Sequence, residues 1–335
     1  MPETCNRVLV EPGSPSHMAG PGWRRLSARG QSMGTQWSLQ CWTCPGLPDP
    51  APLINRAWDE AIALFSPWSR DSALSRFNHA APGWHVLPPE ITGLLDLARD
   101  IAARTGGALD PTLGRLTDLW GFGPSGPVTT PPTPDALERA RAASGLQKLH
   151  APKGGDANQL YQPGGLWLDF GGIAKGWAVD RASALLHTAG LTTHMIELGG
   201  EIAAKGLSPE GAPWWIEVEA APGAPSARWL GALHRGAVAG SGTWRRRSGA
   251  PGQDWSHSLN PATGRPCDGA VVGVHVFHPS AASADAWASA LMVLPPETGL
   301  TIAADNDLSV LLTLRGPGGQ VIRQASPALM EWEAA

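Results

Sequence analysis

The segment Leu168-Asp-Phe-Gly-Gly-Ile-Ala-Lys-Gly176 places one carboxylate and one ammonium around a run of glycines. Residues 166–170 read as a strand that ends at the glycines, and residues 173–189 read as an amphipathic helix that stops before Gly190. Glycines at a strand-to-helix turn let the backbone approach an anion, and the free N–H groups of the first helical turn point toward it. The segment therefore predicts a phosphate-binding turn.

Lys175 supports this prediction because the chain rarely uses lysine. Only four of its 25 Lys and Arg residues are lysines, so a compact ammonium stands where Arg is the usual choice. The alternative is an ordinary strand-to-helix turn with a solvated lysine, and the segment alone leaves that alternative open. A Walker A loop is excluded because no Ser or Thr follows Lys175-Gly, and Asp169-Phe-Gly lacks the other kinase signatures.

The composition is that of a globular enzyme. The 335 residues are 42% hydrophobic and carry a formal net charge of -4, which excludes a strongly basic nucleic-acid-binding protein. Arg245-Arg-Arg247 is the only basic cluster, and we interpret it as a solvated loop. The 41 Gly and 32 Pro are spread along the chain, so a collagen-like or disordered protein is also excluded.

The order of predicted elements favours the α+β class, because strands and helices mix without strict βαβ alternation. Strands are predicted at residues 36–42, 193–198, 215–220, 228–234, 271–277 and 308–314, and helices at 53–65, 90–104, 135–143, 282–294 and 296–305. Residues 1–30 are rich in Pro and Gly, and we predict a poorly ordered tail there. A single domain is predicted over residues 31–330.

No targeting segment is visible. The first 25 residues contain no apolar core of a signal peptide, and no later segment has about 18 apolar residues in a row. We therefore expect a cytoplasmic protein without a membrane span. If the true start lies upstream, a membrane-anchored periplasmic protein is the alternative.

Cysteine spacing gives one further candidate. Cys41-Trp-Thr-Cys44 has the spacing of a zinc or redox pair, but it lies on a predicted strand with no second pair and no nearby His. We interpret these cysteines as packing residues, with a metal or redox role as the alternative.

Five blocks in the right order carry a family resemblance. From Gly34 to about Leu294 the chain resembles the ApbE-type FAD:protein FMN transferases. The blocks are Met33-Gly-Thr35; Phe65 to Asn78; Thr105 to Thr112 with Leu119 to Gly123; Leu168 to Asp180 with Glu197 to Gly206; and Gly240 to Trp244 with His257 to Gly264 and Ala284 to Ala290. Each block alone is a weak motif, whereas five in register make coincidence unlikely.

The resemblance implies a fold, a reaction and a partner. It implies a mixed-sheet catalytic unit of two lobes with a flavin cleft between them. The implied reaction is the Mg²⁺-dependent transfer of FMN from FAD to a Ser or Thr hydroxyl of an acceptor protein with a Thr-containing motif, with release of AMP. Two alternatives remain open, namely an FAD pyrophosphatase that yields FMN and AMP, and a flavin-binding protein without catalytic activity.

Asp285 and Ser289 are the candidate metal ligands. They stand four residues apart on a predicted helix, so their oxygens face one way, and Mg²⁺ prefers such hard ligands. The alternative is that Asp285 serves the dipole of a first helical turn. The resemblance favours a site for Mg²⁺, or for Mn²⁺ in its place, to which Gly172 adds a backbone carbonyl. In this family Thr usually stands where this chain has Ser289.

The resemblance also implies a set of FAD contacts. Trp68 stands where Tyr is usual, and Leu109 where Phe is usual; the predicted contacts are Met33, Trp68, Ala108, Leu109, Asp110, Asp169, Lys175 and Leu259. Two of these residues have structural alternatives from the sequence alone. Asp110 precedes Pro111 and could be a helix N-cap, and Trp68 could be a core tryptophan.

His257 is the candidate general base for the acceptor hydroxyl. It precedes the turn Asn260-Pro-Ala-Thr-Gly264, and His is the side chain that titrates nearest neutral pH. In the resembling family this turn more often begins with Asp than with Asn. Without the family pattern, a single loop His is more simply a structural or solvated residue.

Overall fold

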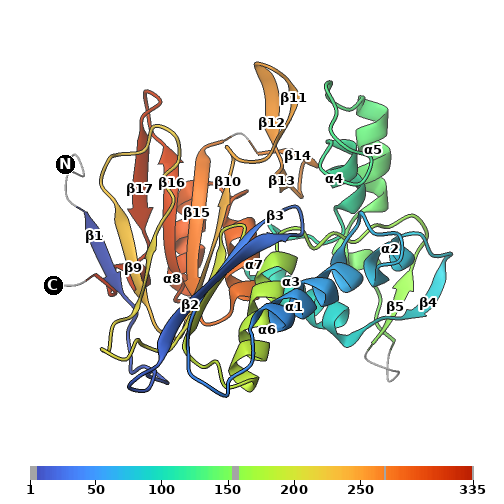
Figure 1. The fold of residues 1–335 in the computed structure, drawn as a ribbon. Helices are drawn as coiled ribbons and strands as arrows, with labels where there is room; N and C mark the ends of the chain where they lie inside the picture. The colour runs from blue at the N-terminus through green and yellow to red at the C-terminus, as the bar shows by residue number, and fades with distance from the viewer. Residues whose placement is uncertain (1–5, 153–157, 268, 334–335) are drawn as a thin grey trace. The chain divides into compact units, whose positions relative to one another are not determined.

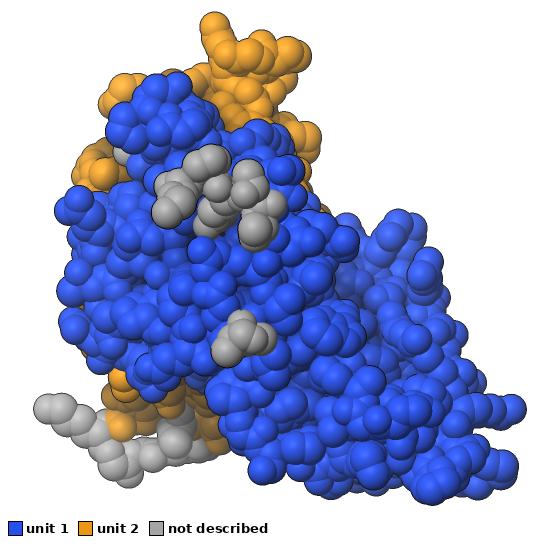
Figure 2. Space-filling model, turned by 90° about the vertical axis from the view of Figure 1, so that its left-hand side faces the viewer, with its two compact units in different colours: residues 1–60, 172–242, 270–335 blue, residues 61–171, 243–269 orange. Residues whose placement is uncertain are grey.

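The structure is a computed structural model that describes residues 6–152, 158–267 and 269–333. The chain forms two compact units, each built from separated segments. Unit 1 comprises residues 1–60, 172–242 and 270–335, and unit 2 comprises residues 61–171 and 243–269, as coloured in Figure 2. The chain thus passes from unit 2 into unit 1 between Gly171 and Gly172, inside the predicted phosphate-binding turn.

Unit 1 is built on an eight-stranded sheet in which neighbouring strands are antiparallel (Figure 1). In spatial order its strands are β17 (Val321–Ala325), β16 (Ser309–Arg315), β15 (Val271–His278), β10 (Ala237–Gly242), β7 (Glu201–Lys205), β6 (His194–Leu198), β3 (Thr35–Thr43) and β2 (Arg24–Ser32). A second sheet contains β1 (Arg7–Val10), β9 (Trp229–Leu233) and β8 (Trp214–Glu217).

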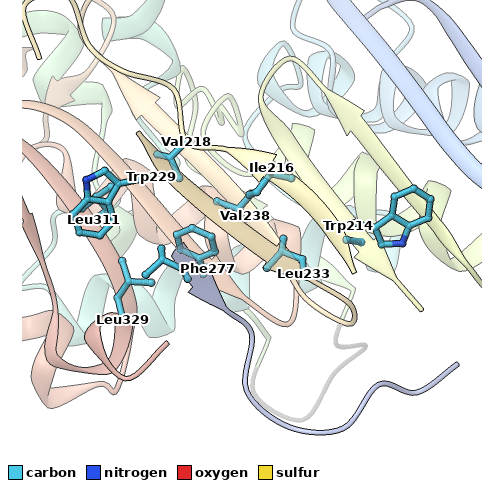
Figure 3. Close-up of a cluster of buried hydrophobic side chains, with 11 residues drawn as sticks. Trp214, Ile216, Val218, Trp229, Leu233, Val238, Phe277, Leu311 and Leu329 are labelled. Atoms are coloured by element: carbon cyan, nitrogen blue, oxygen red, sulfur yellow. The ribbon is translucent and has the colours of Figure 1, made fainter. Parts of the chain in front are cut away.

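An apolar cluster joins the two sheets of unit 1. In β8, Trp214 and Ile216 are buried while Trp215 and Glu217 are exposed, which is the period-two pattern of a strand with one covered face. The cluster combines side chains of both sheets, among them Leu9. Figure 3 labels Trp214, Ile216, Val218, Trp229 and Leu233 with Val238, Phe277 and Leu311.

Helices cover the other face of the large sheet. Helix α6 (Ala174–Thr188) packs against β6 and β7, and α7 (Ala281–Leu291) packs against β7, β10, β15 and α6 (Figure 1). Helix α8 (Pro296–Asp305) also packs against β16 on this face, whereas the short helix α9 (Pro327–Met330) packs against β16 on the other side and adds Leu329 to the apolar cluster. Helix α1 (Ala51–Phe65) continues from unit 1 into unit 2.

The described residues of unit 2 are mainly helical, with three two-stranded sheets. Its helices are α2 (Ala73–Asn78), α3 (Pro89–Arg104), α4 (Gly114–Leu119), α5 (Pro134–Ala143) and the 3-10 turn η1 (Leu146–Lys148). Two of these sheets are hairpins, β11 (Arg247–Ala250) with β12 (Gln253–Ser256) and β13 (Leu259–Asn260) with β14 (Arg265–Pro266), whereas β4 (Gly83–Val86) pairs with the distant β5 (Gln159–Gln162). One of its cores consists of Leu113, Leu116, Trp120, Phe122, Leu137, Ala140 and Leu259.

The prediction of a poorly ordered tail over residues 1–30 is wrong for the residues that the structure describes. Arg7–Val10 forms β1, which pairs in parallel with β9, and Arg24 begins β2. Leu9 is fully buried, because it inserts between the two sheets of unit 1. Residues 1–5 lie outside the described part of the chain.

A second prediction is corrected at residues 166–170. This segment is not a strand: only Trp167 forms an isolated bridge, with Leu113. The predicted helices at 53–65, 90–104, 135–143, 173–189 and 296–305 are confirmed to within two residues, and the α+β class is confirmed. Within the described residues, no helix combines the length and the apolar character that crossing a membrane requires.

Candidate active site

The starts of helices α6 and α7 are held together without any space for an additional atom. A Cβ on Gly176 would lie 2.2 Å from the carbonyl oxygen of Ala281, far inside van der Waals contact. Asp180 of α6 binds the first turn of α7, accepting from the Ser280 hydroxyl at 2.7 Å and from the backbone N–H groups of Ala281 at 2.8 Å and Ala282 at 3.0 Å. Close packing and these hydrogen bonds therefore fix where the inner side chains of α7 point.

The three predicted metal ligands are brought together by this packing. Asp285 is only 3% exposed, and its Oδ2 accepts from the Gly176 N–H at 3.2 Å. The Ser289 hydroxyl, one turn further along α7, donates to the Gly172 carbonyl at 3.3 Å. A Cβ on residue 172 would lie 2.3 Å from Ser289 Oγ, so only glycine leaves these oxygens accessible to each other. A carboxylate, a hydroxyl and a carbonyl are the oxygen ligands that Mg²⁺ and Mn²⁺ prefer.

The alternative role for Asp285 is wrong. The N-cap of α7 is Ser280, and the first turn of the helix contains no acidic residue. Asp285 lies one turn further in, where its carboxylate is buried. Burial raises the pKa of the Asp285 carboxyl, and the nearby Lys175 ammonium and the Gly176 N–H act in the opposite direction. A buried carboxylate of this kind needs a positive partner, which the dipole of an exposed helix end does not.

Lys175 has a partner that the sequence did not reveal. Its Nζ lies 2.5 Å from Oε1 of Glu201, the first residue of β7, whose side chain is fully buried. Burial raises the pKa of the Glu201 carboxyl, and the Lys175 ammonium acts in the opposite direction by stabilising the carboxylate. The freely solvated lysine of the alternative interpretation is therefore wrong. The contact between Lys175 and FAD stays a prediction.

Glu201 could have been found from one signal in the sequence. It begins the run Glu201-Ile-Ala-Ala-Lys205, and in β7 Glu201 and Ala203 share the face that is covered by helices. A carboxylate at an inward position of an apolar strand is rare unless it is paired. Period-two reading of this strand would therefore have pointed to a buried charge with a basic partner.

Met33 lies at the same end of the large sheet as Glu201. It forms, with Gly34, the two-residue turn between β2 and β3, and both have positive φ, 48° and 73°. Gly199 in the turn between β6 and β7 donates to the Gln36 carbonyl at 3.0 Å. Trp37 of β3 pairs with Leu198 of β6, which in turn pairs with Glu201 of β7. Unit 1 thus gathers Gly172, Lys175, Glu201, Asp285 and Ser289 around the start of α6, with Met33 at the same end of the large sheet as Glu201.

Unit 2 brings the two predicted FAD-binding carboxylates onto neighbouring segments. The Asp169 N–H donates to the Pro111 carbonyl at 2.8 Å. The side chain of Asn78 holds the same segment by accepting from the Leu168 N–H at 2.7 Å and donating to the Leu168 carbonyl at 2.8 Å. The blocks that contain Asn78, Pro111 and Asp169 therefore meet in unit 2.

Asp110 and Asp169 both sit in local turns. Asp110 Oδ1 accepts from the Thr112 N–H at 2.8 Å and its hydroxyl at 2.6 Å, while Asp169 Oδ1 accepts from the Gly171 N–H at 2.8 Å. The helix N-cap alternative for Asp110 is wrong, because α4 begins at Gly114 with Leu113 as its N-cap. Burial raises the pKa of the Asp110 carboxyl, against the opposing hydrogen bonds from Thr112.

The other predicted FAD contacts differ in accessibility. Trp68 is 58% exposed, so the core-tryptophan alternative is wrong and its ring is available for a ligand. Ala108 and Leu109 are almost buried in the turn after α3, where the Ala108 N–H donates to Thr105 Oγ1 at 3.3 Å. Leu259 belongs to an apolar core of unit 2, so packing already accounts for that leucine.

His257 is half-buried beside an aromatic cluster of unit 2. Its ring centroid lies 6.1 Å from that of Phe122 in an edge-on arrangement. The cluster is fixed by two indole hydrogen bonds: Trp255 Nε1 donates to the Trp120 carbonyl at 3.0 Å, and Trp120 Nε1 donates to the Gly264 carbonyl at 2.8 Å. The imidazole is therefore carried on a rigid frame, which a positioned base requires.

The pair Cys41 and Cys44 shows no sign of a metal site. Cys41 is buried in β3, and burial raises the pKa of its thiol to about 11, so the thiolate that binds a metal is disfavoured. Among the described residues no group of three or more His, Cys, Asp or Glu side chains is placed to bind a metal ion.

Comparisons with known proteins agree with one another. The sequence model of the ApbE family matches residues 33–312. The FAD:protein FMN transferase of Vibrio cholerae is 33% identical over 315 residues, covering 92% of this chain and 90% of the relative, and that of Klebsiella pneumoniae is 31% identical, covering 89% and 86%.

Solved structures extend the similarity to the fold. The flavin transferase ApbE from Vibrio cholerae superposes with a TM-score of 0.81 at 32% identity over 92% of this chain and 99% of that one. The apo flavinyl transferase ApbE from Pseudomonas stutzeri gives 0.84 at 30% identity, covering 93% and 98%. With the family's sequence model spanning most of the chain and relatives above 30% identity along nine-tenths of it, this protein belongs to the ApbE family of flavin transferases.

Proposed function

We propose that this enzyme transfers FMN from FAD to a Ser or Thr hydroxyl of an acceptor protein in a reaction that depends on Mg²⁺ and releases AMP. The acceptor oxygen attacks the phosphorus of the FMN half of the diphosphate, and the bond from that phosphorus to the bridging oxygen breaks. The electron pair leaves on the phosphate of AMP, and the hydroxyl proton goes to a base. Such chemistry depends on alignment and charge neutralisation more than on covalent catalysis.

The observation that carries the proposal is the arrangement around the start of α6. Asp285, Ser289 and the Gly172 carbonyl present three oxygen ligands within unit 1, linked to one another through Gly176 and the Ser289 hydrogen bond. These residues would hold Mg²⁺, which when bound supplies positive charge to the diphosphate. Lys175 follows Gly172 by three residues and offers a second positive charge to the same phosphates.

The charges around Lys175 support a cation site. Asp285 and Glu201 are two buried carboxylates, and the Lys175 ammonium acts on both of them. One ammonium cannot neutralise two buried carboxylates, and an uncompensated buried charge costs several kcal/mol. A divalent cation on Asp285 supplies the missing positive charge.

In unit 2 we assign FAD contacts to Trp68, Asp110 and Asp169, and the base to His257. The exposed Trp68 ring offers a flat surface for stacking. The two aspartates can accept hydrogen bonds from hydroxyl or amine groups of FAD. His257 accepts the proton of the acceptor hydroxyl.

The test uses purified protein with FAD, Mg²⁺ and a candidate acceptor protein that carries a Thr-containing motif. A fluorescent acceptor band that survives denaturation supports transfer. Free FMN and AMP without labelled acceptor would instead indicate an FAD pyrophosphatase, and unchanged FAD a carrier; either result with a competent acceptor would overturn the proposal.

A matched pair of variants on α7 tests the cation site. Ser289→Ala removes a proposed ligand, whereas Ser283→Ala removes a hydroxyl on the same helix that has no assigned role. We expect Ser289→Ala to need more Mg²⁺ for half-maximal transfer and Ser283→Ala to match the wild type. Asp285→Ala should abolish transfer while the protein stays folded and still binds FAD. Full activity of Asp285→Ala in EDTA-treated buffer would refute the assignment of the metal.

A further inference from the structure

Glu201 has no role in the reaction as described so far, yet its side chain is fully buried. It begins β7 directly after the turn at Gly199 and Gly200, whose φ values of 65° and 111° favour glycine. The strand therefore starts with a carboxylate directed toward the helical layer, where Lys175 Nζ lies 2.5 Å away. An apolar residue would fill this inward position without the cost of burying a charge.

Lys175 is close to two carboxylates with different roles. Its Nζ forms an ion pair with Glu201 at 2.5 Å, and the N–H of the next residue, Gly176, donates to Asp285 Oδ2 at 3.2 Å. Asp285 is the proposed ligand of the divalent cation, whereas Glu201 is not. A lysine that neutralised Asp285 would compete with the cation for the same carboxylate, because both are positive charges that satisfy it.

We propose that Glu201 is a positioning residue that serves as the counter-charge of Lys175 and so leaves the Asp285 carboxylate available to the divalent cation. This inference rests on the cation site proposed above. It separates the two positive charges of the site, with the ammonium held by β7 and the cation held by α7. Both charges are then present when the FAD diphosphate binds, instead of one displacing the other.

The inference makes opposite predictions for the two partners. Glu201→Gln keeps the shape of the side chain and removes its charge, so Lys175 becomes the counter-ion of Asp285 and cation binding weakens. Lys175→Met removes the competing ammonium, so cation binding stays as tight as in the wild type or becomes tighter. In the double variant Glu201→Gln/Lys175→Met there is no ammonium to compete, and cation binding recovers.

The experiment measures Mn²⁺ binding to metal-free protein by titration calorimetry and by the electron paramagnetic resonance signal of free Mn²⁺, without FAD. A neighbouring opposite charge typically shifts the pKa of a carboxyl group by about one to three units, a tenfold or larger change in proton affinity, and we expect Glu201→Gln to weaken Mn²⁺ binding to Asp285 by about tenfold or more through the same electrostatic effect. The double variant should return to within about threefold of the wild type. If Glu201 served only for packing, adding Lys175→Met to the Glu201→Gln variant would not restore Mn²⁺ binding.

Glu11→Gln is the matched control. Glu11 is another buried carboxylate of unit 1, 7% exposed, which accepts from the backbone N–H groups of His234 at 2.7 Å and Arg235 at 2.9 Å. Its neutralisation should affect stability but not Mn²⁺ binding. Glu201→Asp keeps the charge and should bind Mn²⁺ more tightly than Glu201→Gln, which covers the case in which the glutamine variant folds poorly.

Three results would overturn the inference. These are wild-type affinity in Glu201→Gln, a double variant as weak as Glu201→Gln, or weaker binding in Lys175→Met than in the wild type. Failure of the cation site itself is distinguishable, because then the wild type would bind no Mn²⁺ and Asp285→Ala would change nothing.

Discussion

Gly176→Ala probes the contact between α6 and α7 on which the site depends. In a helix this substitution normally stabilises, since Ala restricts the unfolded chain, by about 0.5–1 kcal/mol. At residue 176 the new Cβ would lie 2.2 Å from the Ala281 carbonyl oxygen, 2.6 Å from the Ala281 carbonyl carbon and 2.7 Å from the Ala282 Cα. All three are backbone atoms, so no side chain can rotate away and the helices themselves have to separate.

The free energy of unfolding should fall by about 2–4 kcal/mol. Overpacking of a close contact costs about 1–3 kcal/mol. Separating the helices also lengthens the 3.2 Å bond from the Gly176 N–H to Asp285, and a hydrogen bond to a charged group contributes about 1.5–3 kcal/mol. The gain in helix propensity offsets only part of these losses. For a unit of this size the melting temperature should fall by roughly 5–15 °C.

Gly93→Ala is the control, because Gly93 lies inside α3 and nothing stands within 4 Å of where its Cβ would be. Thermal unfolding followed by circular dichroism should show Gly93→Ala at or above the wild-type melting temperature and Gly176→Ala well below it. Mn²⁺ binding should weaken only in Gly176→Ala, since Asp285 moves with α7. Equal stabilisation of both variants would refute the argument that this contact is closed.

Four further predictions concern single side chains. Burial lowers the pKa of His194 to about 4. Below pH 6.5 the unfolded chain therefore binds a proton that the folded protein does not, and the free energy of unfolding should fall by up to about 3 kcal/mol between pH 6.5 and 4. Urea unfolding of His194→Gln should lack this loss. Asp180→Ala removes three hydrogen bonds to the start of α7 and should lower the urea unfolding free energy by about 2 kcal/mol or more, with Asp180→Asn in between. Lys175→Met should weaken FAD binding by on the order of 1–3 kcal/mol in titrations without metal, and unchanged affinity at both low and physiological salt would contradict a diphosphate contact. His257→Ala should lower the transfer rate at saturating FAD by about 10²–10⁴ while FAD affinity barely changes, and an unaltered rate would mean that the proton leaves by another route.

Local patterns predicted the helices that have a strong apolar stripe or a clear stop signal. Helix α6 ends before Gly190, whose φ is 88°, and α8 begins with a proline, as the sequence indicates. Local patterns failed where pairing is long-range. Strand β2 reads Arg-Arg-Leu-Ser-Ala-Arg-Gly-Gln-Ser, too polar to be recognised, because an edge strand buries little of its surface.

In the candidate site, too, the residues related by local spacing could be predicted, and those brought together by long-range packing could not. Asp285 and Ser289 share a helical face, so spacing alone places them together, and the family pattern adds Gly172 and Lys175. Period-two reading marks Glu201 as an inward carboxylate, but its pairing with Lys175 depends on how α6 packs against β7, which a sequence cannot provide. The resemblance implied two lobes, but local patterns could not show which segments form each unit, because each is assembled from segments that lie far apart along the chain.

The parallel pairing of β1 with β9 has a consequence for synthesis of the protein. Arg7 pairs with Trp229, so the first strand leaves the ribosome more than 200 residues before its partner exists. At about 5–20 residues per second this delay is roughly 10–40 s, which is long compared with the folding time of a small domain. During that interval the apolar segment Arg7–Val10 is exposed on the nascent chain. A folding helper that holds the amino-terminal segment during translation should therefore raise the yield of active protein more than one that acts after release.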